Sequence, residues 1–389
     1  MNELTVNDDY DTAATLFPGG GGADMGLSAA GLDVKWGLEY DDNIAQVARE
    51  NGLNIHTADV TKVDPDWYER VDVLHASPPC PNFSIAKTGA EETDEDVSLA
   101  HATVRFVQAL EPALFTLENV WGYRKSQSWK LIREHLQQNG YDWNGWHLNC
   151  ADYGAPQTRK RMIVAARKGG PRPKKPAATH AEDPSSGGLF DDTLDEWVGW
   201  YEAIEDLIPD LPETELADWQ KERLPDEVKT VLIDGKPMSF GGELQPNRAS
   251  DPVQTISASN QKHMPRAVLV PGGNGSSFVT RTDGQPSRTI SKQPGNCDRA
   301  VMGRRVVQMT PRCLARFQAF PDWYELPNSK SLACRIIGNA VPPLAMKIWV
   351  GYWGDGEGAL ALLRPKAGER PTEAPITDEY DPLAQAEDN

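Results

Sequence analysis

The run of glycines at residues 19–22 is the feature that most constrains the fold of this chain. It follows a short apolar segment, residues 13–17, which we expect to form a strand, and it precedes a helix-like segment. Glycines in such a turn let the backbone approach a nucleotide-like ligand closely. Glu39 ends the next expected strand about 20 residues later, where an acidic residue commonly binds ribose hydroxyls. A simple turn explains the glycines equally well, so these residues alone leave the ligand open.

The alternation of short strand-like and helix-like segments continues to about residue 167. Further strands are expected at residues 33–39, 71–76, 113–118 and 162–166, and a helix at residues 41–52. This order is typical of an α/β fold, in which helices cover the faces of a mostly parallel sheet.

The composition changes after Lys168, first to proline, glycine and lysine and then to acidic residues, which predicts a domain boundary. We predict a catalytic, cofactor-binding domain formed by residues 1–168 and 305–365. Residues 169–304 are expected to form a smaller, irregular β-rich domain. The acidic, proline-containing residues 366–389 are expected to be a disordered tail.

The formal net charge of −18 argues, taken alone, against a nucleic-acid partner, because phosphate groups are neutralised by Lys and Arg. The basic residues, however, are concentrated in two groups. They are Arg159, Lys160, Arg161, Arg167, Lys168, Arg172, Lys174 and Lys175, and then Arg299, Arg304, Arg305, Arg312 and Arg316. A locally positive surface can attract DNA to a protein that is acidic overall. A merely acidic or salt-adapted surface explains the excess acid equally well.

The 5 cysteines are scattered, with no Cys-x-x-Cys pair and no histidine at metal-ligand spacing. We therefore expect neither a disulfide framework nor a metal site. The first residues are acidic and lack an apolar core, and no apolar run is long enough to span a bilayer. The expectation is a cytoplasmic protein without a membrane partner.

Cys80 differs from the other cysteines in its surroundings. It lies in the segment Ser77-Pro-Pro-Cys80, directly after the expected strand at residues 71–76. Open α/β sheets bind their ligands at the carboxyl ends of the strands, so Cys80 is a candidate nucleophile. A lone cysteine that packs as a small hydrophobe is the commoner outcome when this motif is considered by itself.

Two further segments carry residues suited to catalysis. Glu118 and Asn119 end the strand that follows in the sequence, although a single Glu there is more often a cap or a surface group. Arg159 and Arg161 alternate before the strand at residues 162–166. In an extended chain such alternation turns one face inward, and buried arginines need partners.

At this point the chain resembles a known family, the DNA cytosine-5 methyltransferases. The similar segments, in the order of the family's motifs, are LFPGGGGADMGL, LEYDDNIAQVARENG, SPPCPNFS, LENV, DYGAPQTRKR, MTPRCLARFQAFP and IIGNAVPP. They cover both ends of the chain. They leave about residues 170–300 unmatched, where this family keeps its variable target-recognition segment.

The resemblance implies a Rossmann-like, class I S-adenosylmethionine-dependent methyltransferase that acts on double-stranded DNA as a monomer. The Cys80 thiolate would attack carbon 6 of a flipped cytosine, Glu118 would protonate or hydrogen-bond ring nitrogen 3 and the exocyclic amine, Arg161 would hold oxygen 2, and Arg159 would support the loop. The implied cofactor contacts are Phe17, Gly19, Gly21, Gly22, Glu39, Tyr40, Asp59, Val60, Pro79, Asn339, Ala340 and Val341. The implied DNA or base contacts are Ser84, Asn119, Gln157 and Arg316.

The chain departs from the family pattern at three places. Pro81 replaces a glutamine, Thr15 stands where an aspartate is common, and Cys313-Leu314 replaces Glu-Cys. None of these changes removes a group that does the chemistry. Two alternatives remain: a cytosine-5 methyltransferase that acts on tRNA, whose Cys-Phe-Thr signature is missing here, and a catalytically silent DNA-binding relative, against which the intact Cys80, Glu118 and Arg161 argue.

Overall fold

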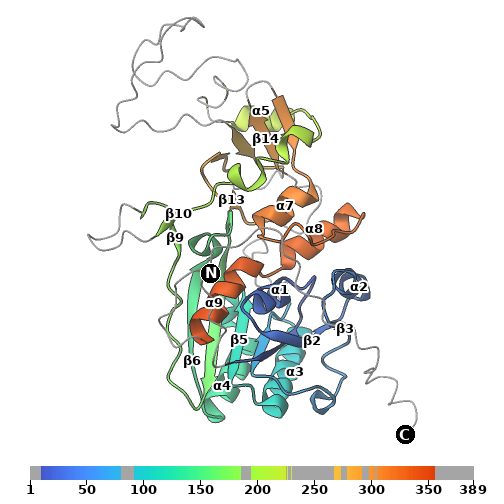
Figure 1. The fold of residues 1–389 in the computed structure, drawn as a ribbon, viewed down its shortest axis with the longest axis vertical. Helices are drawn as coiled ribbons and strands as arrows, with labels where there is room; N and C mark the ends of the chain where they lie inside the picture. The colour runs from blue at the N-terminus through green and yellow to red at the C-terminus, as the bar shows by residue number, and fades with distance from the viewer. Residues whose placement is uncertain are drawn as a thin grey trace, which may run out of the picture.

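The chain has two lobes, a large one built on a seven-stranded sheet and a small one beyond one end of that sheet (Figure 1). The computed structural model describes residues 10–79, 92–184, 194–224, 226, 229, 267–272, 278–290, 298–302 and 305–354. The predictions for Cys80, for Ser84 and for the tail at residues 366–389 lie outside these residues, as does much of the segment 169–304.

The large sheet has the strand order β3-β2-β1-β4-β5-β8-β6. The strands are β1 (Thr12–Leu16), β2 (Asp33–Glu39), β3 (Ile55–Thr57), β4 (Val73–Ala76), β5 (Leu114–Asn119), β6 (Tyr141–Asn149) and β8 (Lys160–Lys168). The first five in spatial order run parallel, and β8 runs antiparallel to both β5 and β6. This arrangement confirms the predicted Rossmann-like α/β fold. It also brings the carboxyl ends of β4 and β5 together with the start of β8.

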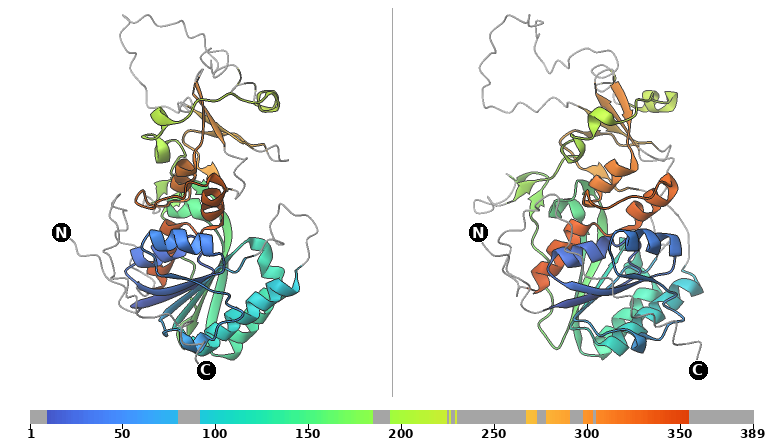
Figure 2. Two further views of the ribbon diagram at one scale, coloured as in Figure 1. Left: turned by 90° about the vertical axis from the view of Figure 1, so that its right-hand side faces the viewer. Right: turned by 45° about the vertical axis from the view of Figure 1, so that its right-hand side comes forward.

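Helices cover both faces of this sheet (Figure 2). Helices α3 (Asp94–Leu110) and α4 (Gln127–Gln138) pack on one face, where Phe106, Phe115 and Ile132 share a buried apolar cluster. Helices α1 (Gly22–Ala29) and α9 (Pro343–Gly354) pack together on the other face. The C-terminal helix therefore returns to the glycine turn, as the resemblance implies.

The helix ends follow from local sequence. Asp41 begins α2 (Asp42–Glu50) by accepting hydrogen bonds from the backbone N–H groups of Asn43 and Ile44. Thr93 and Asp96 form a reciprocal capping box that begins α3. These caps fix the residues at which the two helices begin.

The small lobe contains a four-stranded antiparallel sheet in the order β12-β11-β14-β15. Its strands are β11 (Val268–Val270), β12 (Arg281–Thr282), β14 (Arg299–Met302) and β15 (Arg305–Gln308). Since β15 pairs with β14, this sheet includes residues that the sequence analysis assigns to the large domain. Short pairs of strands, β7 (Gln157–Thr158) with β13 (Ser287–Arg288) and β9 (His180–Ala181) with β10 (Asp195–Glu196), lie between the two sheets.

Three further α-helices lie in the described residues. Helix α5 (Asp218–Arg223) belongs to the small lobe. Helices α7 (Pro311–Phe317) and α8 (Lys330–Asn339) lead from the small sheet back to the glycine turn. They share one buried apolar cluster with residues of both lobes, among them Met25 and Ala300.

Candidate active site at the carboxyl edge of the sheet

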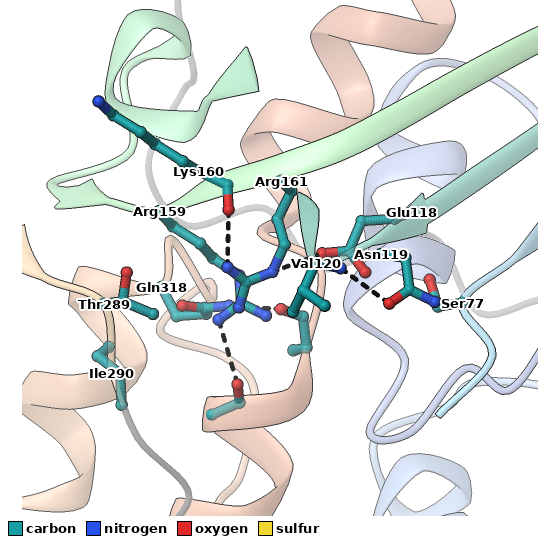
Figure 3. A network of polar contacts seen from close by, with 12 residues as sticks. Ser77, Glu118, Asn119, Val120, Arg159, Lys160, Arg161, Thr289, Ile290 and Gln318 are labelled. Atoms are coloured by element: carbon teal, nitrogen blue, oxygen red, sulfur yellow. Dashed lines mark hydrogen bonds and ion pairs between the residues drawn. The ribbon is translucent and has the colours of Figure 1, made fainter. Parts of the chain in front are cut away.

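Glu118 and Arg161 meet at the end of β5. Glu118 of β5 lies opposite Ile163 of β8. Arg161 is two residues before Ile163, so its side chain lies on the same face of the sheet as that of Glu118. The Arg161 Nε atom is 3.0 Å from Glu118 Oε1, and both side chains are largely buried (Figure 3). Glu118 Oε1 nevertheless accepts no hydrogen bond from any described residue, because the guanidinium is not aligned with it. A buried carboxylate oxygen at this edge thus has spare capacity for a substrate.

Asn119 joins this acid to the segment that leads to Cys80. Its Nδ2 group donates to the Pro78 carbonyl at 3.1 Å, and its Oδ1 atom accepts from the Val120 N–H. Pro78 precedes Cys80 by two residues. The side chain of Asn119 is buried and both of its ends have protein partners, so these contacts do not support a direct base contact by Asn119.

His75 is a polar residue of this region that the sequence analysis missed. It lies buried in β4 between Thr116 Oγ1 and Ser77 Oγ, at 2.9 and 2.8 Å from its two ring nitrogens. Burial lowers the pKa of His75 to about 3, so the ring is neutral. A histidine inside an otherwise apolar parallel strand is the signal that indicates its role. It positions Ser77, the first residue of the Ser-Pro-Pro-Cys segment.

Arg159 faces the interior, which confirms that the arginine pair does not lie idle in solvent. It is 2% exposed, and its Nη1 group donates to the carbonyl of Gly338 at 3.2 Å. Gly338 lies in the last turn of α8, immediately before Asn339. Arg159 thus connects the residues just before β8 to the end of α8, where the resemblance places cofactor contacts.

Gln157 and Gln318 form a buried junction beside Arg159. The Nε2 group of Gln157 donates to Gln318 Oε1 at 2.6 Å, and Gln318 in turn donates to the carbonyl of Ala340 at 2.5 Å. The remaining oxygen of Gln157 accepts from the N–H of Ile290, which belongs to the small lobe. Both glutamines are fully buried. A direct base contact by Gln157 therefore has no support in its surroundings.

Arg316, the other predicted DNA contact, is also engaged inside the protein. It forms a bidentate ion pair with Asp206, at 2.9 and 3.0 Å, and a second ion pair with Asp322. Its Nη1 group also donates to the carbonyl of Ala203. These contacts hold α7 against residues 203–206 of the small lobe and do not indicate a phosphate contact.

The predicted basic groups are divided between different parts of the molecule. Lys160 and Arg161 lie at the catalytic edge, whereas Arg167 and Lys168 lie at the far end of the nine-residue strand β8, about 20 Å away. Lys168 pairs there with Glu111. Of these four residues, Lys160 and Arg161 are the two that lie near a ligand at the carboxyl edge.

The glycine turn carries the features expected of a nucleotide-like site. Phe17 has a φ of 61°, an uncommon backbone conformation for a bulky residue that is often found at ligand sites. Gly19, with a φ of 57°, has open space where a side chain would begin. Glu39 accepts hydrogen bonds from the N–H groups of Gly19 and Asp41, and burial raises the pKa of its carboxyl.

Tyr40, next to this carboxylate, is 75% exposed and leaves an aromatic face available. Asp59 accepts from the N–H and hydroxyl of Thr61 and pairs with Lys62 at 3.0 Å. Val60 is buried and Pro79 is exposed. The open space at Gly19, the carboxylate of Glu39 and the exposed ring of Tyr40 together fit an adenosine-containing cofactor.

The other glycines of the turn are explained by packing. A side chain at Gly22 would lie 2.3 Å from the Val341 carbonyl, and one at Gly21 would lie 2.1 Å from Leu53 Cδ1. Ala340 and Val341 are buried against the turn, whereas Asn339 is exposed. Gly22 is therefore required for the close approach of the C-terminal segment, which leaves Asn339 as the accessible polar group of that segment.

Asp24 is a second buried acid, which the sequence analysis did not single out. Thr15 donates to its Oδ1 atom at 2.7 Å, and its Oδ2 atom has no hydrogen-bond partner among the described residues. Burial raises the pKa of Asp24 to about 6. The threonine at the position where the resembling family commonly has aspartate thus faces an acid from the adjoining helix.

The described cysteines are not candidates for a nucleophile. Cys150, Cys313 and Cys334 are all free and buried. Burial raises the pKa of Cys150 to about 12. Within the ranges that the structure describes, no three His, Cys, Asp or Glu side chains are grouped to hold a metal ion. No described helix has the length and apolar character to cross a membrane.

The family description C-5 cytosine-specific DNA methylase matches residues 12–350. The chain belongs to this family. It is thus a methyltransferase, and this chemistry requires a methyl donor.

Individual relatives agree with this assignment. The chain is similar to the type II methyltransferase M1.HphI of Haemophilus parahaemolyticus, with 23% identity over 346 residues that cover 86% of this chain and 84% of the relative. It is similar to the type II methyltransferase M.XorII of Xanthomonas oryzae pv. oryzae, with 29% identity, covering 85% and 81%.

Solved structures share the fold. One is described as a DNA modification methyltransferase encoded within a prophage (E. coli), with 21% identity and a TM-score of 0.53, covering 88% of this chain and 98% of that one. Another is the S. pombe Dnmt2 methyltransferase, with 13% identity and a TM-score of 0.52, covering 87% and 96%.

Proposed function

We propose that this chain transfers a methyl group from S-adenosyl-L-methionine to carbon 5 of a flipped cytosine in double-stranded DNA, with Cys80 as a covalent nucleophile. The observation that carries this proposal is the buried Glu118 carboxylate, which has an unfilled acceptor at the carboxyl edge of the sheet. Arg161 forms an ion pair with Glu118. The next residue, Asn119, donates a hydrogen bond to the carbonyl of Pro78, two residues before Cys80.

Carbon 5 of cytosine is a poor nucleophile, so the ring must first gain electron density. The Cys80 thiolate attacks carbon 6, and the electron pair displaced from the 5,6 double bond makes carbon 5 nucleophilic. Glu118 stabilises this state by donating a proton or a hydrogen bond to ring nitrogen 3 and by accepting from the exocyclic amine, and Arg161 holds oxygen 2. After methylation, loss of the carbon 5 proton and of the thiolate restores the aromatic ring.

The residues around the glycine turn hold the cofactor. Glu39 would accept the ribose hydroxyls, and Phe17, Gly19, Tyr40, Asp59 and Asn339 would complete the site. When bound, the cofactor supplies an electrophilic methyl group. Arg159 acts indirectly, because it fixes Gly338 next to Asn339.

A cytosine inside a duplex cannot present carbon 6 to a thiol, so the target base must leave the stack. The segment 169–304 would select the target sequence through base-edge contacts. The duplex would lie between this segment and the domain formed by residues 1–168 and 305–365. The protein would act as a monomer. The contacts of Gln157 and Arg316 indicate that these two residues hold the lobes together instead of reading bases.

The test is methyl transfer from labelled S-adenosylmethionine to plasmid DNA, followed by conversion sequencing. We expect 5-methylcytosine at a defined sequence, and no transfer by Cys80→Ala. Methylation of tRNA in place of DNA would favour the RNA alternative. Cofactor binding without methylation of either nucleic acid would favour a silent relative, and full activity of Cys80→Ala would refute the nucleophile.

A further inference from the structure

An aromatic and cationic cluster lies directly beside the candidate active site. Trp121, three residues after Glu118, stacks on His147 of β6, with ring centroids 4.5 Å apart and an interplanar angle of 15°. The Arg124 guanidinium carbon lies 4.7 Å from the centre of the Trp121 ring. We call Trp121, His147, Arg124 and the adjacent Lys160 the edge cluster.

The edge cluster belongs to the catalytic edge by register. His147 of β6 lies opposite Met162 of β8, and Met162 lies opposite Asn119 of β5. The cluster is therefore level with the residue that follows Glu118. Trp121 packs by its apolar part against the core beneath α3 and α4, which fixes the position of its ring.

The cluster is exposed and carries an excess of positive charge, although Asp152 lies close enough to Lys160 for the two charges to interact. Arg124, His147 and Lys160 are exposed, and neither Arg124 nor Lys160 forms an ion pair within the part of the chain that the structure describes. The charges acting on His147 all come from cations, since Lys160, Arg124 and Arg161 add to burial in lowering its pKa. In a protein with a net charge of −18, unpaired cations gathered at one edge call for an anionic partner.

The geometry of Arg124 favours a phosphate as that partner. A guanidinium that lies over an aromatic ring keeps the donors on its edge free, and the ring restrains its orientation. Such a fork matches the two oxygens of a phosphate, and Lys160 adds a second, flexible donor. A polymer with repeating phosphate groups can contact both residues at once.

We propose that the edge cluster binds the sugar-phosphate backbone of double-stranded DNA next to the flipped cytosine. This inference rests on the proposed function, since it places the duplex across the carboxyl edge of the large sheet. Arg124 and Lys160 each contact a phosphate group, and Trp121 and His147 form the rigid support for Arg124. The contacts position the duplex and carry no sequence information.

The experiment measures the binding of duplex DNA by full-length protein as a function of salt, in Arg124→Gln, Lys160→Gln and the matched control Arg70→Gln. Arg70 is an exposed arginine just before β4, at the opposite end of the sheet, and loses the same charge. We expect the slope of log K against log salt to fall by about 0.9 for each edge-cluster change, with a similar loss for duplexes of any sequence. Arg70→Gln should leave the slope unchanged.

Affinity for S-adenosylhomocysteine serves as the check on folding and should not change in any variant. Unchanged salt slopes for Arg124→Gln and Lys160→Gln, in a wild-type protein that methylates duplex DNA, would overturn the edge cluster alone. Failure of the wild-type protein to methylate any duplex would instead overturn the proposed function. A slope change seen with tRNA but not with duplex DNA would contradict the choice of partner.

Discussion

Two polar regions lie a few residues apart along the segment 157–161, and they are built in opposite ways. At the junction, Gln157 and Gln318 are fully buried, and their described hydrogen bonds all end on protein groups. At the catalytic edge, Glu118 is buried beside Arg161, yet its Oε1 atom accepts no hydrogen bond from a described residue. Saturated polar groups define the shape of a protein, whereas unsatisfied ones are costly and persist where a ligand completes them.

The sharpest test of this difference is Glu118→Gln, which keeps the shape of the side chain but removes its charge. We expect the rate of methyl transfer to fall by about 10²- to 10⁴-fold, because the group that stabilises ring nitrogen 3 is lost. The measurement is single-turnover transfer on a methylatable duplex, with the melting temperature as the control. A melting temperature that falls together with the activity would mean that Glu118 acts on stability, as Gln157 and Gln318 do.

The matched change at the junction is Gln318→Leu. It leaves the Ala340 carbonyl buried without its described partner and the Gln157 Nε2 group with the longer contact to the Phe317 carbonyl at 3.4 Å, which should cost about 2–4 kcal/mol in the free energy of unfolding. Single-turnover transfer by the remaining folded protein should change much less than in Glu118→Gln. Urea unfolding measures the loss. The double variant Gln157→Leu/Gln318→Leu should cost less than the sum of the two single changes, because each single change already removes their shared hydrogen bond, and a cost equal to or above the sum would contradict the pairing.

Asp24, beside the glycine turn, tests whether a buried acid outside the Glu118–Arg161 pair lowers the stability of the protein. Its pKa is about 6 in the folded protein against 3.8 in the unfolded chain, so the folded state holds the proton more tightly. The contribution of Asp24 to stability is therefore fully present below about pH 4 and is lost as the pH rises through about 6, by up to about 3 kcal/mol. Asp24→Asn should remove this loss and be more stable than the wild type at about pH 7. Parallel pH profiles of the two proteins would contradict the burial of a titrating acid.

Arg316 should give the smallest effect. Its partners Asp206 and Asp322 are more than half exposed, so solvent screens both ion pairs. We expect Arg316→Gln to cost about 1 kcal/mol of stability, measured by urea unfolding, and to leave the salt slope of DNA binding unchanged. A slope that falls by about one would restore Arg316 as a phosphate contact.

Much of the large lobe could be predicted because its strands are local patterns. The glycine turn, β2 and the strand before Ser77 each follow from a few neighbouring residues. Strand β6 was missed because, at the edge of the sheet, it mixes tryptophans with Asn144, Gly145 and other polar residues. The antiparallel direction of β8 also leaves no mark in the sequence.

The site could be predicted only where a motif marks it. Glu118 and Arg161 meet at the ends of neighbouring strands, and Arg159 turns inward, as expected from the alternation of the two arginines. Gln157 was expected to face DNA, because residue type does not distinguish an exposed amide from one whose partner lies 161 residues away. His75 and Asp24 were missed for the same reason, since their burial depends on distant strands and helices.

The most direct measurement is covalent trapping on a duplex in which the target cytosine carries fluorine at carbon 5. Fluorine cannot leave as a proton does, so the adduct at carbon 6 should persist once the methyl group has been transferred. The account predicts a stable protein–DNA complex that depends on S-adenosylmethionine, with the link on Cys80 in the digested peptide, and no complex with Cys80→Ala. A link at any other residue, or trapping that survives Cys80→Ala, would contradict it.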